Sequence, residues 1–198
     1  MTSAIRRPAH RPSRKAAVVE AAIGLFATYP IDEVTVGDIA AAADMTSAAV
    51  YYHFASKEQI LLTGLGEFVD RLLDEARRAA SVPDAVPSQV ISATLTWIRA
   101  QGTPAVVYFI ASAGLNMHLE ALRRDTRFEL NAILQPVITA ARADANRAEV
   151  GVIATALVSL LETASAAWLS EDVAFRGLGA RRFPTEVVAL ADRITGAS

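Results

Sequence analysis

The sequence contains no cysteine among its 198 residues. This absence excludes a disulfide framework, a thiolate nucleophile and a zinc or iron–sulfur centre held by cysteine, and it suits a reducing compartment. Proline and glycine are also sparse, at 8 and 10 residues, so the chain is neither fibrous nor of low complexity. The three histidines, His10, His53 and His118, lie far apart and form no metal-ligand motif. We therefore expect no metal and no cofactor.

The sequence also lacks a long uncharged apolar run. The longest candidate membrane segment, from Gly151 to Leu161, has about half of the ~20 residues that span a bilayer, and Glu162 closes it. With 53% hydrophobic and 20% charged residues, the chain can bury a substantial core, which excludes disorder as its dominant state. We expect a soluble, cytoplasmic protein with no membrane partner.

Charge is nearly balanced overall but unevenly distributed. The formal net charge of −2 does not by itself point to a strongly negative or a strongly positive binding partner. Five positive charges nevertheless precede Glu20, the first acidic residue, and we call residues 6–15 the basic arm. No apolar segment follows these charges, so the arm is not a secretion signal. It has two interpretations, a DNA-contacting arm or a solvated tail. The five residues are Arg6, Arg7, Arg11, Arg14 and Lys15.

Helical periodicity runs through almost the whole chain, and no stretch combines alternating β-branched residues with hairpin turns. The sequence therefore predicts an all-α fold. The capping pattern of Thr35 with Asp38, and that of Ser56 with Gln59, mark two helix starts. We expect helices over residues 14–29, 36–43, 47–52, 56–80, 88–100, 104–115, 120–142, 145–169 and 184–195, with the longest loop between residues 170 and 183.

Residues 14–54 have the layout of a helix-turn-helix DNA reader, with two short helices around a tight turn after a longer helix. The segment from Thr35 to Glu58 reads TVGDIAAAADMTSAAVYYHFASKE. It resembles the N-terminal signature of the TetR family of transcriptional regulators. The positions that carry this resemblance are Ile39, Ala40, Tyr51, His53, Phe54, Ser56, Lys57 and Glu58.

The resemblance implies a TetR-like architecture of about nine helices. Residues 1–55 would form the basic arm and a three-helix DNA-binding head, and residues 56–198 a ligand-binding and dimerisation body, with the helix over 56–80 connecting the two. It also implies a homodimeric repressor that binds a palindromic operator in double-stranded DNA. A small molecule in the body would release the DNA, and the scarcity of charge there favours an uncharged, hydrophobic effector.

Two features of the head depart from the family pattern. Asp44 stands where glycine is common in the turn, and aspartate tolerates a left-handed backbone. Ser47 and Tyr52 occupy positions often held by lysine or arginine, so phosphate attraction must come from the arm and Lys57. His53 has an alternative interpretation as a packing residue. The candidate DNA-binding residues are Arg14, Lys15, Thr35, Thr46, Ser47, Ala48, Tyr51, Tyr52, His53 and Lys57.

The body offers a candidate dimer interface and candidate pocket residues. Its last two helices carry more apolar surface than one monomer covers, which favours a four-helix interface across a two-fold axis. The candidate interface residues are Val152, Ala156, Leu157, Leu160, Val187, Leu190, Ala191 and Ile194. A pocket needs aromatic and apolar walls with a few polar groups. The candidate ligand-binding residues are Trp97, Tyr108, Phe109, Met117, His118, Phe128, Asn131 and Glu162.

Three other functional classes are alternatives to a ligand-responsive repressor. An enzyme is not indicated, because the sequence holds no phosphate loop, no GxSxG elbow and no HExxH motif. The uncharged recognition helix leaves open a TetR-fold ligand-binding or interaction module without sequence-specific DNA binding. A constitutive DNA binder without an effector is the third alternative.

Overall fold

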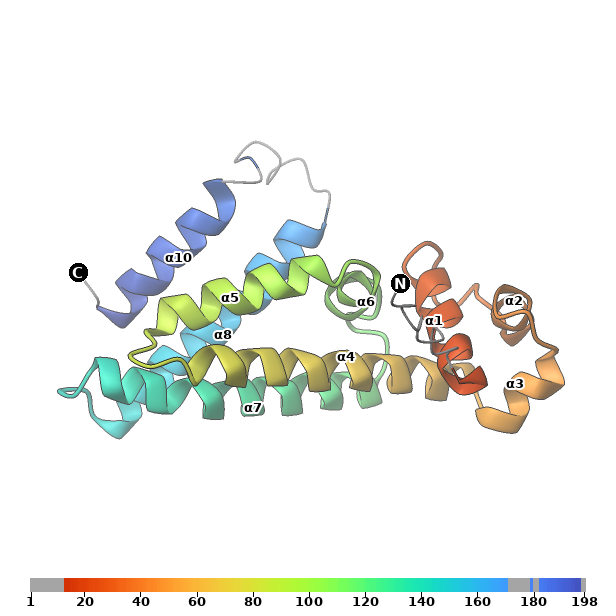
Figure 1. The fold of residues 1–198 in the computed structure, drawn as a ribbon, viewed down its shortest axis with the longest axis horizontal. Coiled ribbons are helices and arrows are strands. Elements are labelled where there is room, and N and C mark those ends of the chain that lie inside the picture. The colour runs from red at the N-terminus through yellow and green to blue at the C-terminus, as the bar shows by residue number, and fades with distance from the viewer. Residues whose placement is uncertain (1–12, 171–178, 180–181, 197–198) are drawn as a thin grey trace, which may run out of the picture.

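The computed structural model describes residues 13–170, 179 and 182–196, and within these ranges the chain is all-helical, as expected. Most of the loop expected between residues 170 and 183 lies outside the described residues. A head of three helices lies at one end of an elongated molecule, and a larger helical body occupies the rest (Figure 1). The helices are α1 (Arg14–Phe26), α2 (Val36–Ala42), α3 (Ser47–His53), α4 (Lys57–Ala80), α5 (Pro87–Ala100), α6 (Thr103–Val106), α7 (Met117–Ala141), α8 (Arg147–Leu169) and α10 (Arg182–Thr195), with a π-helical turn η1 (Val107–Ala111) after α6.

Local capping fixes the helices of the head. The Thr35 hydroxyl accepts a hydrogen bond from the Asp38 amide at 3.2 Å, and the Asp38 carboxylate accepts one from the Thr35 amide at 2.8 Å. Hydrogen bonds from Thr35 to the carboxylate hold the pKa of Asp38 below its ordinary value. Thr46 caps α3 by accepting from the Ala49 amide. Asp44, with φ of 54°, makes the left-handed turn between α2 and α3, which confirms the prediction for that position.

The connecting helix α4 runs from the head along the body, with α7 beside it (Figure 1). Its cap differs slightly from the expected one. Ser56 accepts from the Gln59 amide, but the Gln59 side chain accepts from the amide of Ala55 at 2.7 Å and not from that of Ser56. The body is completed by α5, α8 and α10, which pack against one another.

The segment expected as one helix over 104–115 is divided. One turn of α6 passes into η1, where the Ser112 amide donates to the Val107 carbonyl, five residues earlier. Arg123 of α7 reaches back to this turn and donates through Nη2 to the Tyr108 carbonyl and, at 2.9 Å, to the Ser112 hydroxyl. Periodicity alone does not reveal such a turn, because a contact from another helix stabilises it.

The helix α8 is longer than the apolar run seen in the sequence. Its 23 residues and a mean hydropathy of 1.7 in its most apolar window meet the length and composition of a membrane span. The expectation that the longest apolar segment reaches only half of that length is therefore wrong for the helix as folded. Its face of Ala154, Leu157 and Leu161 is buried against the rest of the body. This is the arrangement of a core helix in a bundle.

The head packs tightly against α4 at Gly64. A Cβ there would lie 2.8 Å from Cγ1 of Ile23 and 3.0 Å from Cγ1 of Val19, both on α1, whereas a Cβ at Gly66 of the same helix would point into open space. We expect Gly66→Ala to stabilise the fold by up to about 1 kcal/mol through helix propensity. Gly64→Ala should instead destabilise it by about 1 kcal/mol or more, because crowding outweighs that gain. Urea unfolding of the two variants compares them directly, and equal stabilisation would contradict this packing.

Candidate nucleic-acid interface

The outer face of α3 is a row of exposed, uncharged side chains. Ser47, Ala48, Tyr51 and Tyr52 are all exposed, with Tyr51 at 56% and Tyr52 at 85% of their full accessible surface. The opposite face of α3 holds Val50, which is fully buried. Because no packing inside the described chain accounts for two tyrosines on one short helix, this face is suited to contact another molecule.

The other polar side chains expected at this face already make contacts within the head. The hydroxyls of Thr35 and Thr46 serve as helix caps, and the Thr35 hydroxyl also donates to Asp38 at 2.6 Å. The half-buried His53 ring packs edge-on against Tyr52, with 5.1 Å between ring centroids. Thr46 and His53 still border the exposed row, whereas Thr35 lies at the start of α2.

Positive charge in the described part of the head comes from Arg14 and Lys15 at the start of α1. Both are exposed, and the Lys15 ammonium also lies 5.4 Å from the centre of the buried Phe54 ring. Arg14 borders a hollow of about 840 Å³ together with Thr46 and Asp44. The start of α1 therefore adjoins the start of α3. The remaining arginines of the basic arm, Arg6, Arg7 and Arg11, lie outside the described residues.

Lys57 does not have the position that we expected for it. Its Nζ donates to the carbonyl oxygens of Ile31 at 2.6 Å, Val34 at 2.7 Å and Asp32 at 3.2 Å. An ammonium group has three donors, and all three are used here. The expectation of an ammonium free to bind phosphate is thus corrected: Lys57 ties the connection between α1 and α2 to the start of α4.

The described part of the head is consequently acidic. Residues 13–56 contain two basic side chains, Arg14 and Lys15, against five carboxylates. These carboxylates are Glu20, Asp32, Glu33, Asp38 and Asp44. Because attraction to phosphate supplies most of the non-specific affinity for DNA, binding by this head depends heavily on the basic arm.

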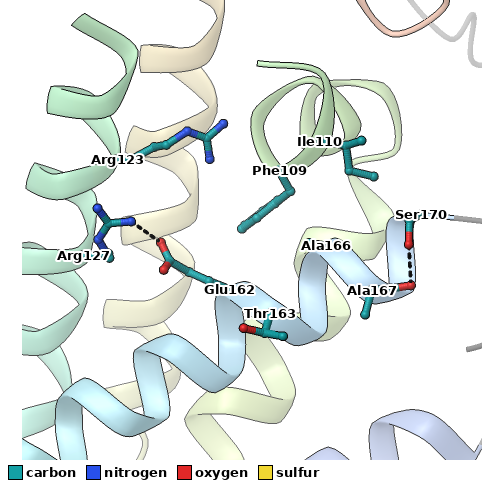
Figure 2. Close-up of a pocket in the computed structure, with 9 residues that line it drawn as sticks. All are labelled: Phe109, Ile110, Arg123, Arg127, Glu162, Thr163, Ala166, Ala167 and Ser170. Carbon is teal, nitrogen blue, oxygen red and sulfur yellow. Dashed lines mark hydrogen bonds and ion pairs between the residues drawn. The ribbon is translucent and has the colours of Figure 1, made fainter. Parts of the chain in front are cut away.

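The body contains an open pocket between α7, α8 and η1, with a volume of about 550 Å³. Of the candidate ligand-binding residues, it brings together Phe109 and Glu162. In Figure 2, Arg123 and Arg127 lie on α7, Glu162 lies opposite them on α8, and Phe109 points toward them from η1. The other lining residues are Ile110, Thr163, Ala166, Ala167 and Ser170.

The charged groups of this pocket are incompletely paired. Arg127 Nη1 lies 3.5 Å from Glu162 Oε1, and Arg123 Nε lies 3.5 Å from Glu120 Oε1. Arg123 is only 11% exposed, and its buried Nε donates no hydrogen bond within the described structure. Burial raises the pKa of Glu162, against the opposing effect of the two arginines. Arg123 and Arg127 are not among the residues predicted from sequence, although their spacing of four residues places them on one face of a helix.

The other candidate ligand-binding residues do not line this pocket. Met117 and Phe128 are 79% and 72% exposed and line no described pocket. His118 contacts Glu58 of α4 at 2.9 Å between Nδ1 and Oε1. Trp97 and Tyr108 pack against Phe68 in the core, and burial raises the pKa of Tyr108. Asn131 donates to the Arg127 carbonyl and accepts from the Thr155 hydroxyl.

The candidate dimer residues divide into two groups. Val152 and Leu190 are exposed, and Ala156, Leu160 and Ile194 are partly exposed, so these five residues remain available to a second copy. Leu157, Val187 and Ala191 are buried within the monomer, which corrects their assignment to the interface. They point inward because α8 and α10 also pack against α5 and each other.

The structure describes no group of three or more histidine, aspartate or glutamate side chains arranged to hold a metal ion. The arrangement that it does show is a helix-turn-helix with an uncharged exposed face, joined to a helical body with a pocket. These features define a regulator of the helix-turn-helix type.

Comparison with known proteins identifies the family. Residues 18–63 match the family described as bacterial regulatory proteins, tetR family. The HTH-type transcriptional regulator BetI of Agrobacterium fabrum is 32% identical over 119 residues, which are 58% of this chain and 54% of that protein. The HTH-type transcriptional repressor KstR2 of Mycolicibacterium smegmatis is 37% identical over 65 residues, 33% of this chain and 32% of that protein. The matches thus span about half or less of these relatives.

The solved structures extend the likeness to the whole chain. A bacterial regulatory protein of the tetR family from Rhodococcus RHA1 is 25% identical, with a TM-score of 0.73 over 95% of this chain and all of that one. The fatty acid degradation regulator FadR of Bacillus halodurans has the same fold, with a TM-score of 0.75 at 14% identity over 96% of this chain and 98% of that one. Residues 18–63 therefore match the TetR family of bacterial regulatory proteins, and the chain as a whole shares the fold of solved TetR-family regulators. The BetI and KstR2 relatives are named as transcriptional regulators.

Proposed function

We propose that this protein is a cytoplasmic, ligand-responsive repressor that binds a palindromic operator as a homodimer. The observation that carries the proposal is the exposed face of α3 on a helix-turn-helix head. Base contacts come from Thr46, Ser47, Ala48, Tyr51 and Tyr52, whose hydroxyl and methyl groups suit the major groove. Phosphate contacts come from Arg14, Lys15 and the rest of the basic arm.

Two copies pair through the outer faces of α8 and α10. The available side chains are Val152, Ala156, Leu160, Leu190 and Ile194. Pairing across a two-fold axis places two α3 helices on successive major grooves, about 34 Å apart. A palindromic operator follows from that symmetry.

A small molecule with largely apolar surface binds in the pocket between α7, α8 and η1. Phe109 and Ile110 of η1 line that pocket, and α6 and η1 also pack against α1 of the head. A ligand that displaces η1 therefore moves α1 as well as α4, and with them the spacing of the two α3 helices. The effector and the operator are coupled because the effector binds one spacing of the two α3 helices more tightly than the other.

Selection of binding sites from random duplex DNA by the purified full chain tests the DNA-binding part of the proposal. We expect enrichment of a palindrome with half-sites about one helical turn apart. Failure to enrich any motif at low salt, where phosphate contacts are strongest, would contradict it. That outcome would favour the second candidate, a TetR-fold ligand-binding or interaction module, which the acidic composition of residues 13–56 supports.

Tyr52→Ala should weaken specific DNA binding about tenfold or more without lowering the stability of the fold. The ring is 85% exposed, so its removal leaves no cavity, whereas a lost contact to a base costs about 1–3 kcal/mol. Fluorescence anisotropy with the selected site measures the change, and thermal unfolding checks the fold. Tyr29→Ala, which removes another exposed tyrosine outside α3, is the matched control. Equal affinities for Tyr52→Ala and wild type would remove Tyr52 from the interface.

A further inference from the structure

The pocket described above is lined by more positive than negative side chains. Its lining includes the guanidinium groups of Arg123 and Arg127 but a single carboxylate, Glu162. Arg127 meets that carboxylate through one contact of 3.5 Å, longer than an ordinary charged hydrogen bond. The Ser170 hydroxyl is already used, since it donates to the Ala167 carbonyl.

The other face of the pocket is apolar. Phe109 and Ile110 from η1 and Ala166 and Ala167 from α8 form its walls. A volume of about 550 Å³ is within the range of pockets that hold small organic molecules. A ligand that fits this pocket therefore has hydrogen-bond acceptors at the end beside α7 and a hydrophobic remainder beside η1 and α8.

From this arrangement we propose that the effector is an organic monocarboxylate with a hydrophobic tail, whose carboxylate pairs with Arg127. That this ligand acts as an effector rests on the proposed function. That it binds in the pocket depends only on the chemistry of the pocket.

The charges of the site decide between a carboxylate and an amine. A cationic ligand that pairs with Glu162 would lie beside the positive charges of Arg123 and Arg127. A carboxylate instead pairs with the guanidinium group of Arg127, which matches its planar geometry, and also lies near the positive charge of Arg123.

The number of charges favours a monoanion. Glu120 stays beside Arg123, with Oε1 3.5 Å from Nε, and accepts a hydrogen bond from the Gly114 amide. Glu162 competes with the ligand for Arg127, from which it lies 3.5 Å away. With Glu120 beside Arg123, the pocket offers one arginine, Arg127, to a ligand that carries a single negative charge.

A panel of ligands that differ only in their head group tests the proposal. The probes are 4-phenylbutyrate, 4-phenylbutyramide and 4-phenylbutylamine, with octanoate, octanamide and octylamine as a second series. Isothermal titration of the full chain measures their affinities. We expect both carboxylates to bind about tenfold or more tightly than their amides and amines, as a charge-assisted pair would give. Stronger binding of the amines, no preference, or no binding of either carboxylate at millimolar concentration would overturn the proposal.

Three variants identify the residues responsible. Arg127→Gln should reduce carboxylate affinity about tenfold, whereas Glu162→Gln, which removes the competing charge at the same size, should keep or increase it. Arg124→Gln is the matched control, because Arg124 is an exposed arginine on the same helix outside the pocket. The proposal would be overturned if Glu162→Gln abolished carboxylate binding while Arg127→Gln left the carboxylate affinity unchanged.

The DNA affinity of the same samples separates this inference from the proposed function. Carboxylate binding that depends on Arg127 but leaves operator affinity unchanged would contradict the ligand switch and leave the chemistry of the pocket intact. Release of the operator by an amine or an amide in preference to its carboxylate would support the switch and overturn the monocarboxylate.

Discussion

Replacing Arg14 and Lys15 together with glutamine should sharply weaken DNA binding and flatten its dependence on salt. These are the two basic side chains in residues 13–56, and five carboxylates accompany them. Each lost phosphate contact lowers the slope of log K against log salt concentration by about 0.9. We therefore expect the slope to fall by about 2 for each bound protomer, with the loss of affinity largest at low salt.

The rest of the basic arm extends this test. Arg6, Arg7 and Arg11 add three charges, so the variant with glutamine at all three positions should lower the slope by up to about 3 more. If the arm is instead a solvated tail, this variant will bind like wild type while the Arg14 and Lys15 variant does not. Fluorescence anisotropy across a series of salt concentrations measures all of them.

A control for net charge is available on the body. Arg71 and Arg124 are exposed, and replacing both with glutamine changes the charge of the protein by the same amount as the Arg14 and Lys15 variant. This control should leave the salt slope unchanged. An equal fall in slope for both double variants would show that total charge, and not the start of α1, attracts DNA.

Replacing Lys57 with methionine should destabilise the fold by about 2–4 kcal/mol. The ammonium donates to the carbonyls of Ile31, Val34 and Asp32, and methionine keeps most of the length of the side chain without any donor. Hydrogen bonds from a charged donor contribute about 1.5–3 kcal/mol each, but these carbonyls are only partly buried and regain some water. Urea unfolding gives the loss of stability as a lower midpoint at an unchanged slope.

Lys15 is the natural control, since Lys15 and Lys57 are the only lysines in the chain. Its ammonium lies over the Phe54 ring at 5.4 Å and, within the described structure, donates no hydrogen bond. Lys15→Met should therefore cost about 1 kcal/mol or less. A loss for Lys57→Met no greater than that for Lys15→Met would contradict the role given to the three carbonyl contacts.

The fold class and the organisation of the head follow from local sequence. Thr35 with Asp38, and Thr46 before α3, cap helices through contacts three residues apart. The left-handed turn at Asp44 is closed by short-range backbone hydrogen bonds from the amides of Asp44 and Met45 to the end of α2. Such interactions need no partner from elsewhere in the chain. The family signature over residues 35–58 lies in this same locally determined region.

The three-dimensional structure alone decided the remaining features, because each joins residues distant in sequence. Lys57 lies 23–26 residues from the carbonyls that it contacts, so its sequence context suggests an exposed cation at a helix start. The pocket joins Arg127 to Glu162, 35 positions further along the chain, and periodicity does not specify which faces of two helices meet. For the same reason Leu157 and Val152, both apolar and on α8, could not be separated into core and surface until the packing of α5, α8 and α10 was known.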